Sequence, residues 1–541
     1  MRIIIENIKM SIDADDGDII AAAKKKIAST GIFAIVGGHE SCRLYRRSID
    51  ARRKENIMFV CSVSAEVEMK KGANLMDNAD IKIVSDSLLD LPVKLAAPLD
   101  ESTKKNVVIA GFGPAGMFCA LVLAEMGYCP VVLERGGCVE ERIAAVDRFY
   151  TSGKLGTECN IQFGAGGAGT FSDGKLTTRI NDARCSFILE KFKEFGAPAD
   201  ILYRAKPHIG TDILRDVVKN IDETVKKLGG VVKYNTRLDD IIADKNIAVT
   251  SDGEQIPYHS LVIATGHSAR ETYFNLMKRD FLIEPKPFSV GVRVEHSQHV
   301  IDRKMYGDKI ADNPALIKKL GHAEYALSHR PRNDGRGVYT FCMCPGGEVV
   351  AAASEDGMLV VNGMSRSARD GKNANSAVAV SVMREDFGHS PEKAIEFQRA
   401  IERAAFLSGG GDWSAPVQTA GDFLSNKSGS SPTTNPSYMG GKYNLSDINK
   451  ILPGYICESL KAGLAEFNKK IPGFAGAGVP LTGVETRTSA PVRILRDSGT
   501  LRAFGVSGNV YPCGEGAGYA GGIMSAAADG IKVAEKILQS M

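Results

Sequence analysis

The sequence predicts an α/β chain: a Rossmann-like nucleotide-binding domain, an α+β domain inserted into it, and a ferredoxin-like α/β module in front. Residues 106–134 follow the order strand, glycine turn, helix and strand, and end in an acid. A short strand and a glycine turn return at residues 510–522, where a last helix begins. The length of 541 residues exceeds one ordinary core and favours two or three domains.

The glycine turn at residues 111–116 has the spacing of a dinucleotide-binding fingerprint. Gly111 permits the tight turn, Gly113 lets a pyrophosphate approach the backbone, and Gly116 lets helix and strand pack closely. The helix that starts here offers free N–H groups and a positive dipole to that pyrophosphate. Glu134 closes the unit at roughly the usual spacing of about 20 residues and can accept from both ribose hydroxyls. The predicted contacts of the turn are Gly111, Gly113, Pro114, Ala115 and Gly116.

Composition leaves the partner open. The net charge of +3 favours neither a nucleic acid nor an acidic partner, and the hydrophobic share of 44% is ordinary for a globular protein. No apolar run reaches about 18 residues, and the N-terminus lacks the pattern of a signal peptide. Eleven scattered cysteines without a disulfide or metal-ligand spacing indicate reduced thiols, so we expect a cytoplasmic protein without a metal site.

Residues 1–90 alternate as strands around one amphipathic helix, which predicts the ferredoxin-like module, and residues 91–105 form a linker. A very basic connection joins the two middle strands. It is either a solvated hairpin tip or a contact for an anion, an RNA or a partner protein. Its charged residues are Arg46, Arg47, Arg52, Arg53 and Lys54.

Two further stretches match the GxGxxG pattern formally. Residues 164–169 follow no convincing strand, so we interpret them either as backbone laid against a flat ring or as a structural glycine loop. Residues 516–521 lie between a strand and the last helix, but the chain ends before a second strand could follow. We expect that segment to aim an acid and a helix N-terminus at a cofactor held elsewhere.

The middle of the chain changes character near residue 268. Strand-like pieces alternate with turns up to residue 484, and residues 407–445 are rich in Gly, Ser, Asn and Pro, which predicts a long loop. We therefore expect a nucleotide-binding domain at 106–267 and 485–541, with an inserted substrate domain at 268–484.

The glycine turn with Glu134, the strand end Ala264-Thr265-Gly266 and the ending YPCGE at residues 511–515 resemble the glutathione-reductase-like superfamily of FAD proteins. More specifically, the motifs RRSIDARRK (46–54), FGAGGAGTFSDGKL (163–176), KPHIGTD (206–212), ATGHSAR (264–270) and FCMCPGG (341–347) resemble a bacterial family of uncharacterised FAD-dependent dehydrogenases with a small N-terminal module. The resemblance covers nearly the whole chain. It implies a Rossmann-like FAD-binding domain and FAD as cofactor, but no substrate.

The resemblance also implies residue roles. Gly111, Gly113 and Gly116 would hold the pyrophosphate, Glu134 the adenosine ribose, and Arg135 and the Leu238 backbone would lie at the adenine. Glu515 would face the ribityl hydroxyls or the pyrophosphate side, and the last helix would aim its N-terminus at the flavin, where its dipole raises the reduction potential. The remaining predicted cofactor residues are Gly167, Ala168, Gly169, Thr170, Ala264, Thr265, Gly266, Gly514, Gly521, Gly522 and Ile523.

Only one fingerprint is complete, so we expect one bound dinucleotide and no dedicated NAD(P)H domain. The partners we expect are therefore a small-molecule substrate and either transient NAD(P)H or a redox protein. Cys342 and Cys344 would share one side of a regular strand, which allows either redox work or ordinary packing. We name no catalytic residue, because the charged neighbours of these motifs suit substrate binding and salt bridges equally. They are Lys175, Arg293, Glu295 and His296. His267 follows the strand end and could either lie near the cofactor or simply cap the strand.

Three functions follow as hypotheses. The first is an oxidoreductase that passes a hydride or electrons between a small molecule and FAD. The second is a flavin-dependent RNA-modifying or RNA-associated enzyme, which the basic hairpin suggests. The third is a flavin-binding scaffold or redox sensor without turnover.

Overall fold

The computed structural model describes residues 1–37, 41–71, 80–84, 106–331 and 335–540. The chain forms two compact units. The first comprises 1–92, 175–209 and 299–323, and the second comprises 93–174, 210–298 and 324–541. The predicted linker, 91–105, lies outside the described residues, and the domain boundaries given above stay a prediction.

The first unit is built on a five-stranded sheet. Its strands are β1 (Arg2–Ser11), β2 (Phe33–Ile35), β3 (Cys42–Asp50), β4 (Met58–Met69) and β5 (Ile81–Val84). Four of them follow the antiparallel order β3-β4-β1-β5, which is the order of a ferredoxin-like sheet. Helix α1 (Asp16–Ser29) starts at the capping box of Asp15 and buries Ile19, Ala23 and Ile27. The unit also holds α4 (Arg184–Glu194), η5 (Ala199–Leu202), α8 (Asp308–Ala311), α9 (Pro314–Leu320) and most of α7 (Gln298–Tyr306).

Two arginines of the basic hairpin in this unit are paired with acidic side chains. Arg47 donates to Asp16 at 3.0 Å, and its guanidinium lies 5.3 Å from the ring centroid of Phe59 and 5.0 Å from that of Tyr203. Arg52 pairs with Asp50 at 2.5 Å. A binding role for the hairpin stays a prediction.

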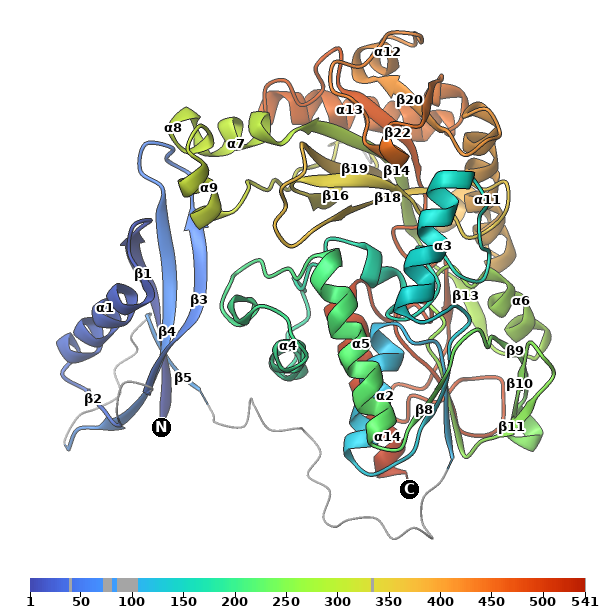
Figure 1. Cartoon of the computed structure of the whole chain (residues 1–541), viewed down its shortest axis with the longest axis horizontal. Helices are drawn as coiled ribbons and strands as arrows, with labels where there is room; N and C mark the ends of the chain where they lie inside the picture. Colours follow the sequence, from blue (N-terminus) through green and yellow to red (C-terminus); the bar gives the residue numbers. More distant parts are fainter. Residues whose placement is uncertain (38–40, 72–79, 85–105, 332–334, 541) are drawn as a thin grey trace. The chain divides into compact units, whose positions relative to one another are not determined.

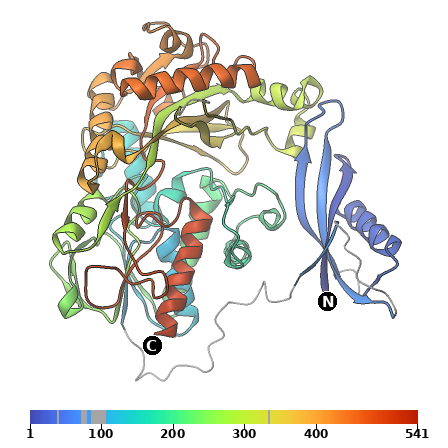
Figure 2. The same cartoon turned by 180° about the vertical axis from the view of Figure 1, so that it is seen from behind.

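The second unit contains a parallel five-stranded sheet of order β24-β12-β6-β7-β8. Its strands are β6 (Val107–Ala110), β7 (Val131–Leu133), β8 (Val231–Lys233), β12 (Ser260–Ile263) and β24 (Val510–Pro512). Helices α2 (Pro114–Glu125), α5 (Thr211–Lys227) and α14 (Ile523–Gln539) lie on one face, and α14 runs along α2 (Figures 1 and 2). Both β6 and β12 are buried throughout, as strands between two covered faces must be. This is the predicted Rossmann-like fold.

Shorter elements surround that sheet. The segment between β7 and β8 holds α3 (Val139–Ser152) and the 3-10 turn η4 (Gly167–Phe171). The antiparallel strands β9 (Leu238–Ile242), β10 (Ile247–Thr250) and β11 (Gln255–Pro257), with η6 (Ala243–Lys245), form a small separate sheet. Helix α6 (Arg270–Lys278) follows β12, and β13 (Ile283–Pro285) pairs with β23 (Val492–Ile494).

Between β13 and β23 the chain builds a seven-stranded, mainly antiparallel sheet of order β15-β16-β19-β14-β22-β20-β21. Figure 1 shows α13 along one face of this sheet and α11 near its far end. The strands are β14 (Phe288–Ser297), β15 (Ser328–His329), β16 (Val338–Cys344), β19 (Asn373–Val382), β20 (Ala415–Thr419), β21 (Tyr443–Leu445) and β22 (Pro480–Glu485). The other elements are β17 (Gly347–Ala351), β18 (Val361–Ser365), α10 (Arg384–Phe387), α11 (Pro391–Ser408), α12 (Ala420–Leu424), η7 (Tyr438–Gly440), η8 (Ile448–Lys450) and α13 (Gly454–Lys470).

The prediction of a long loop at residues 407–445 is wrong. This stretch contributes β20, α12, η7 and β21, and every residue of β20 is buried inside the sheet. The strand is only five residues long, contains Pro416 and is flanked by glycine- and serine-rich turns. Because this composition is typical of loops, the sequence pattern predicts a loop although the strand is buried.

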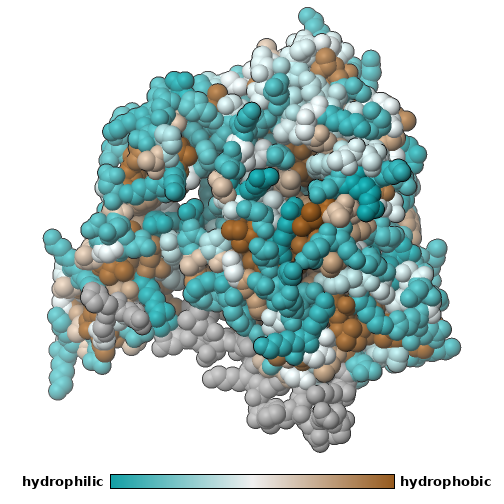
Figure 3. Space-filling model, in the orientation of Figure 1, coloured by the Kyte–Doolittle hydropathy of each residue, from teal (hydrophilic) through white to brown (hydrophobic). Residues whose placement is uncertain are grey.

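Within the described residues, no helix is long and apolar enough to cross a membrane. On the face shown in Figure 3, hydrophobic side chains are scattered among hydrophilic ones and do not gather into a continuous band.

Candidate functional site: a dinucleotide cleft

The glycine turn at residues 111–116 joins β6 to α2 in a geometry that only glycine satisfies at two positions. Gly111 has a φ of 100°, and a Cβ there would lie 2.3 Å from the carbonyl oxygen of Ala264. A Cβ on Gly116 would lie 1.9 Å from the carbonyl oxygen of Gly111. Helix α2 then begins with Gly113 as its N-cap and Pro114 at its first position, without a side-chain cap. Its first N–H groups thus face the predicted pyrophosphate position, next to Ala115.

The loop at residues 164–170 packs directly on this turn. The N–H of Gly166 donates to the carbonyl oxygen of Phe112 at 2.8 Å, and a Cβ on Gly167 would lie 2.9 Å from the Cα of Gly113. In the neighbouring turn η4, the Thr170 hydroxyl donates to the carbonyl of Ala165. The loop therefore lines the turn with backbone, including that of Ala168. It is not a second fingerprint, because helix α3 and not a strand is the element directly before it among the described residues.

The C-terminal segment contacts the same turn and loop, and we call the site that these three segments form the predicted dinucleotide cleft. A Cβ on Gly169 would lie 3.2 Å from a side-chain carbon of Ile523, and one on Gly514 would lie 2.7 Å from the Cβ of Ala115. Thus the first residue of α14, the 164–170 loop and the start of α2 meet. Gly522 is the N-cap of α14 and has no side-chain cap, and a Cβ on either Gly521 or Gly522 would meet nothing within 4 Å.

A buried arginine holds the 164–170 loop in place. Arg142 is fully buried, and its guanidinium donates to the carbonyl oxygens of Asn160 at 2.8 Å, Ile161 at 2.6 Å and Ala165 at 2.7 Å. Burial lowers the pKa of Arg142 to about 10, so it stays charged near neutral pH. Arg142 could not be predicted from the sequence, because its partners are backbone groups about 20 positions away.

Glu134 reaches the turn from the end of β7 and is almost fully buried. Its carboxylate accepts hydrogen bonds from the backbone N–H of Phe112 at 2.7 Å, of Gly136 at 3.0 Å and of Gly164 at 2.9 Å. A carboxylate has about four acceptor positions, so three protein bonds leave about one for a ribose hydroxyl. The acid therefore ties the turn to the loop in addition to its predicted cofactor role.

The predicted adenine end is less open. Arg135 pairs with Glu158 and Glu271, and its guanidinium lies 3.8 Å from the ring centroid of Phe163. The Leu238 side chain is buried in the hydrophobic core under the sheet, which leaves its backbone for a ligand. Contact of Arg135 and Leu238 with adenine stays a prediction.

The strand end after β12 faces the C-terminal segment. A Cβ on Gly516 would lie 2.4 Å from the carbonyl oxygen of Gly266, and the Tyr273 hydroxyl donates to the carbonyl of Gly516 at 2.8 Å. Gly266 has a φ of 76°, and a Cβ there would meet nothing within 4 Å. Beside it, Thr265 and Ala264 back the glycine turn.

These contacts allow a test of fit for a dinucleotide with a flavin ring. The cleft offers two helix N-termini without side-chain caps, glycines whose missing side chains leave open space, and the spare acceptor position of Glu134. These are the groups that bind a pyrophosphate, a ring and a ribose. The residues present therefore fit FAD.

Three titratable side chains lie beside the C-terminal segment. Burial raises the pKa of the Glu515 carboxyl to about 7, and the carboxylate accepts a long hydrogen bond of 3.4 Å from the Gly522 N–H. Burial and the nearby Arg493 lower the pKa of Lys286. Burial, with the charges of Arg487 and Arg270, lowers the pKa of His267 to about 3, so His267 is neutral near pH 7.

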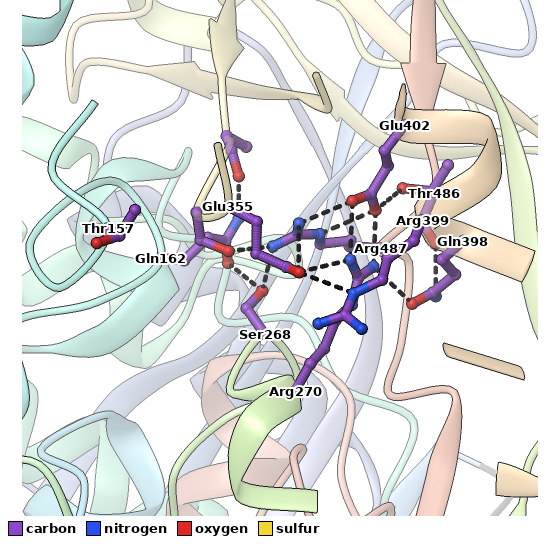
Figure 4. A network of polar contacts seen from close by, with 12 residues as sticks. Thr157, Gln162, Ser268, Arg270, Glu355, Gln398, Arg399, Glu402, Thr486 and Arg487 are labelled. Carbon is purple, nitrogen blue, oxygen red and sulfur yellow. Dashed lines mark hydrogen bonds and ion pairs between the residues drawn. The ribbon is translucent and has the colours of Figure 1, made fainter. Parts of the chain in front are cut away.

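A buried ionic network anchors the segment that carries His267 (Figure 4). Glu402 forms ion pairs with Arg270 at 2.8 Å and with Arg487 at 2.9 Å. The Arg487 guanidinium also donates to the Ser268 hydroxyl at 3.0 Å. Burial alone would raise the pKa of Glu402, but the two arginines lower it overall. Ser268 in turn lies 3.0 Å from His267 Nδ1. Glu355, Gln398, Arg399, Thr486, Ser354 and Gln162 extend the network.

The other candidates from the sequence lie on β14, apart from Lys175. Arg293 is fully buried in β14 and pairs with Glu485 at 2.6 Å, whereas Glu295 accepts from Ser437 and Asn373. His296, also buried, contacts the carbonyl of Phe474 at 2.8 Å. Lys175 belongs to the first compact unit.

The assumption of a regular strand at Cys342 and Cys344 is wrong. Cys342 has a φ of 45°, and the pairing of β16 with β19 shifts between Phe341 and Cys344. All eleven cysteines are free thiols. Among the described residues, no group of three or more His, Cys, Asp or Glu side chains could hold a metal ion.

Two family models match the chain. One, described as pyridine nucleotide-disulphide oxidoreductase, covers residues 105–285, and one, described as FAD-dependent protein, C-terminal domain-like, covers residues 287–488. With the cleft geometry, these matches define a flavoprotein of the oxidoreductase class, and they confirm the predicted cofactor, FAD.

A full-length relative places the chain further. An uncharacterised protein of Clostridium beijerinckii (strain ATCC 51743 / NCIMB 8052) is 46% identical over 545 residues, which cover 100% of this chain and 99% of the relative. The chain belongs with it to an uncharacterised family of FAD-dependent oxidoreductases. The predicted place within the glutathione-reductase-like superfamily stays a prediction.

Solved structures show more distant likeness. The halogenase PltM is 10% identical with a TM-score of 0.37, over 81% of this chain and 70% of that chain. Glycine oxidase from Geobacillus kaustophilus is 11% identical with a TM-score of 0.34, over 81% and 95%. CtdE, solved in complex with FAD, is 10% identical with a TM-score of 0.31, over 81% and 85%. At such scores the likeness carries nothing about the activity of this chain.

Proposed function

We propose that this protein is an FAD-dependent dehydrogenase or reductase that passes a hydride or electrons between the flavin and a small molecule. The observation that carries the proposal is the meeting of the 111–116 turn, the 164–170 loop and the start of α14 in one glycine-lined cleft. The bound flavin supplies the hydride or electron chemistry, so the protein needs no nucleophile of its own.

The residues of the chain would then bind and orient. Helix α2 and the 111–116 turn hold the pyrophosphate, and Glu134 holds the adenosine ribose. The N-terminus of α14 stabilises negative charge at the redox-active ring, which favours reduction. The seven-stranded sheet and its helices shape specificity, and we expect NAD(P)H or a redox protein as a transient partner, because one complete fingerprint holds one dinucleotide.

Anaerobic reduction tests this function. The purified holoprotein would be mixed under nitrogen with NADH, NADPH and a panel of small metabolites, and bleaching of the flavin absorbance would be followed over time. We expect one donor to bleach the flavin and an acceptor to restore it within the same turnover. A flavin that no donor reduces and no acceptor reoxidises would favour a scaffold or sensor instead.

The RNA-linked hypothesis has one specific observation behind it. Arg46, Arg53 and Lys54 are exposed on the basic hairpin, although Arg47 and Arg52 already have acidic partners. RNA that is retained at moderate salt, and lost when Arg46 and Arg53 are replaced by alanine, would support this alternative.

A further inference from the structure

A partly buried lysine, Lys286, lies close enough to Glu515 for their charges to interact but forms no ion pair among the described residues. Lys286 directly follows β13, and its backbone N–H donates to the carbonyl of Pro491 at 2.8 Å. Strand β13 pairs with β23 so that Pro285 lies opposite Val492. Lys286 is thereby fixed at the end of this two-stranded ladder.

The same ladder contacts the C-terminal segment that leads to α14. The N–H of Ile494 donates to the carbonyl of Ala517 at 3.2 Å, and the Arg493 guanidinium donates to the carbonyl of Gly518 at 3.3 Å. Gly516 of this segment packs against the backbone of Gly266. The strand end that carries His267 therefore also contacts the C-terminal segment. Lys286, His267 and Glu515 therefore come from three elements that pack on one another, and the charge of Lys286 acts on both other groups. Glu515 accepts from the N–H of Gly522, the N-cap of α14, where we expect the flavin.

The charges of this group do not cancel. The neighbouring buried cations have carboxylate partners, since Arg270 and Arg487 share Glu402, and Arg496 pairs with Asp529 at 2.6 Å. Lys286 has no ion pair among the described residues. Glu515 is beyond ion-pair distance of it and is half protonated near neutral pH, and the neutral His267 adds no negative charge.

We propose that Lys286 anchors an anionic group, a carboxylate or a phosphate, on the small molecule that exchanges electrons with the flavin. This inference rests on the proposed function. A desolvated ammonium gains more from a charge-assisted hydrogen bond than an exposed one does, because water competes less for it. Such an anchor also orients the reactant against the ring, since Lys286 is held at the end of the β13–β23 ladder.

The test measures anion binding to the holoprotein. Sodium acetate, inorganic phosphate and NADP⁺ would be titrated separately at constant ionic strength and constant pH, with the shift of the oxidised flavin spectrum and calorimetry as readouts. The variants are Lys286→Met, which removes the charge, and Lys286→Arg, which keeps it. Lys427→Met is the matched control, because it removes an exposed lysine of the same compact unit.

We expect at least one probe to bind, with a Kd that rises about tenfold or more in Lys286→Met and less in Lys286→Arg, and that stays unchanged in Lys427→Met. Acetate as the tighter probe would identify a substrate carboxylate, whereas phosphate and NADP⁺ would identify a phosphate of the electron donor. No binding by the wild-type holoprotein, or equal binding by Lys286→Met, would overturn the proposal.

Two further readouts separate this inference from the proposed function. Lys286→Met should still be purified with the wild-type amount of FAD, and its loss of FAD would show that the lysine serves the cofactor, which overturns the proposal. If anions bind through Lys286 but no donor ever bleaches the flavin, the proposed function fails while the anion site stands.

Discussion

Glu134 links the 111–116 turn to the 164–170 loop through its carboxylate. Its two oxygens receive three backbone N–H groups from the turn and the loop. Glu134→Gln puts an amide donor against at least one of these N–H groups and leaves a buried group unpaired. We expect the free energy of unfolding to fall by about 1–3 kcal/mol and the affinity for FAD to fall by about tenfold or more. Urea denaturation and FAD titration check this.

The control for Glu134 is Glu254→Gln, the same chemical change on an exposed carboxylate that pairs with Lys233. It should change stability by no more than about 0.5 kcal/mol and leave FAD binding intact. Equal losses in both variants would show that the carboxylate at position 134 has no special role.

Arg142 makes a second prediction at this scale. Arg142→Met keeps much of the volume but removes the donors to three backbone carbonyls, which leaves them buried and unpaired. We expect a loss of about 2–4 kcal/mol in the free energy of unfolding and the loss of bound FAD, because the 164–170 loop would no longer be held. Arg148→Met, on the exposed side of the same helix, should behave as wild type.

Glu515 gives a pH dependence. Burial raises its pKa from 4.5 to about 7, so between these values the folded apoprotein holds a proton that the unfolded chain has released. Its contribution to the stability of the apoprotein is therefore fully present below about pH 4.5 and is lost as the pH rises through about 7. We expect Glu515→Gln to gain about 1–3 kcal/mol on the wild type between pH 5 and pH 8. Thermal unfolding of both apoproteins across that range tests it, and parallel curves would contradict it.

At the scale of elements, the contact between α2 and α14 positions both helix N-termini. A Cβ on Gly530 of α14 would lie 2.1 Å from the carbonyl oxygen of Ala115 in α2. Gly530→Ala should therefore push the helices apart and destabilise the fold by about 1–3 kcal/mol, with weaker FAD binding. Gly454→Ala, in α13 where nothing lies within 4 Å, should be neutral or slightly stabilising. Denaturation midpoints of the two variants decide between these outcomes.

Prediction from sequence succeeded for elements whose pattern is local. The turn at 111–116, the ferredoxin-like strand order and the start of α14 at Gly522 all follow from short-range periodicity and glycine spacing. The loop assigned to residues 407–445 failed because β20 is stabilised by strands that are distant in the sequence. Cys342 escaped the strand pattern because one left-handed residue breaks the alternation.

The site shows the same limit. The predicted glycines meet in one cleft, but the residues that hold them there, Arg142 and the network around Glu402, could not be found. Their partners are backbone carbonyls and side chains up to 219 positions away, which no local spacing reveals. Lys286 could not be predicted for a related reason. It becomes a candidate only because it has no ion-pair partner among the described residues, and the sequence does not show ion pairs.

At the scale of the whole molecule, the chain combines two compact units, and only the second contains the cleft. The segments that build the cleft lie near the two ends of that unit's part of the chain, around residues 111–170 and 514–523. The chain between them supplies the seven-stranded sheet and the ladder that carries Lys286. The Rossmann-like sheet therefore supplies the cofactor cleft, and the inserted sheet is where we expect substrate recognition.

The most direct test of the central claim is the FAD content of Gly113→Val. Gly113 has an ordinary φ of −81°, and its nearest neighbour to a new Cβ is the Cα of Gly167 at 3.7 Å, so valine adds bulk chiefly to the predicted pyrophosphate position. We predict one FAD per wild-type chain, and a Gly113→Val protein that binds no FAD but unfolds at nearly the temperature of the wild-type apoprotein. A folded Gly113→Val protein that binds FAD with wild-type affinity would contradict the account.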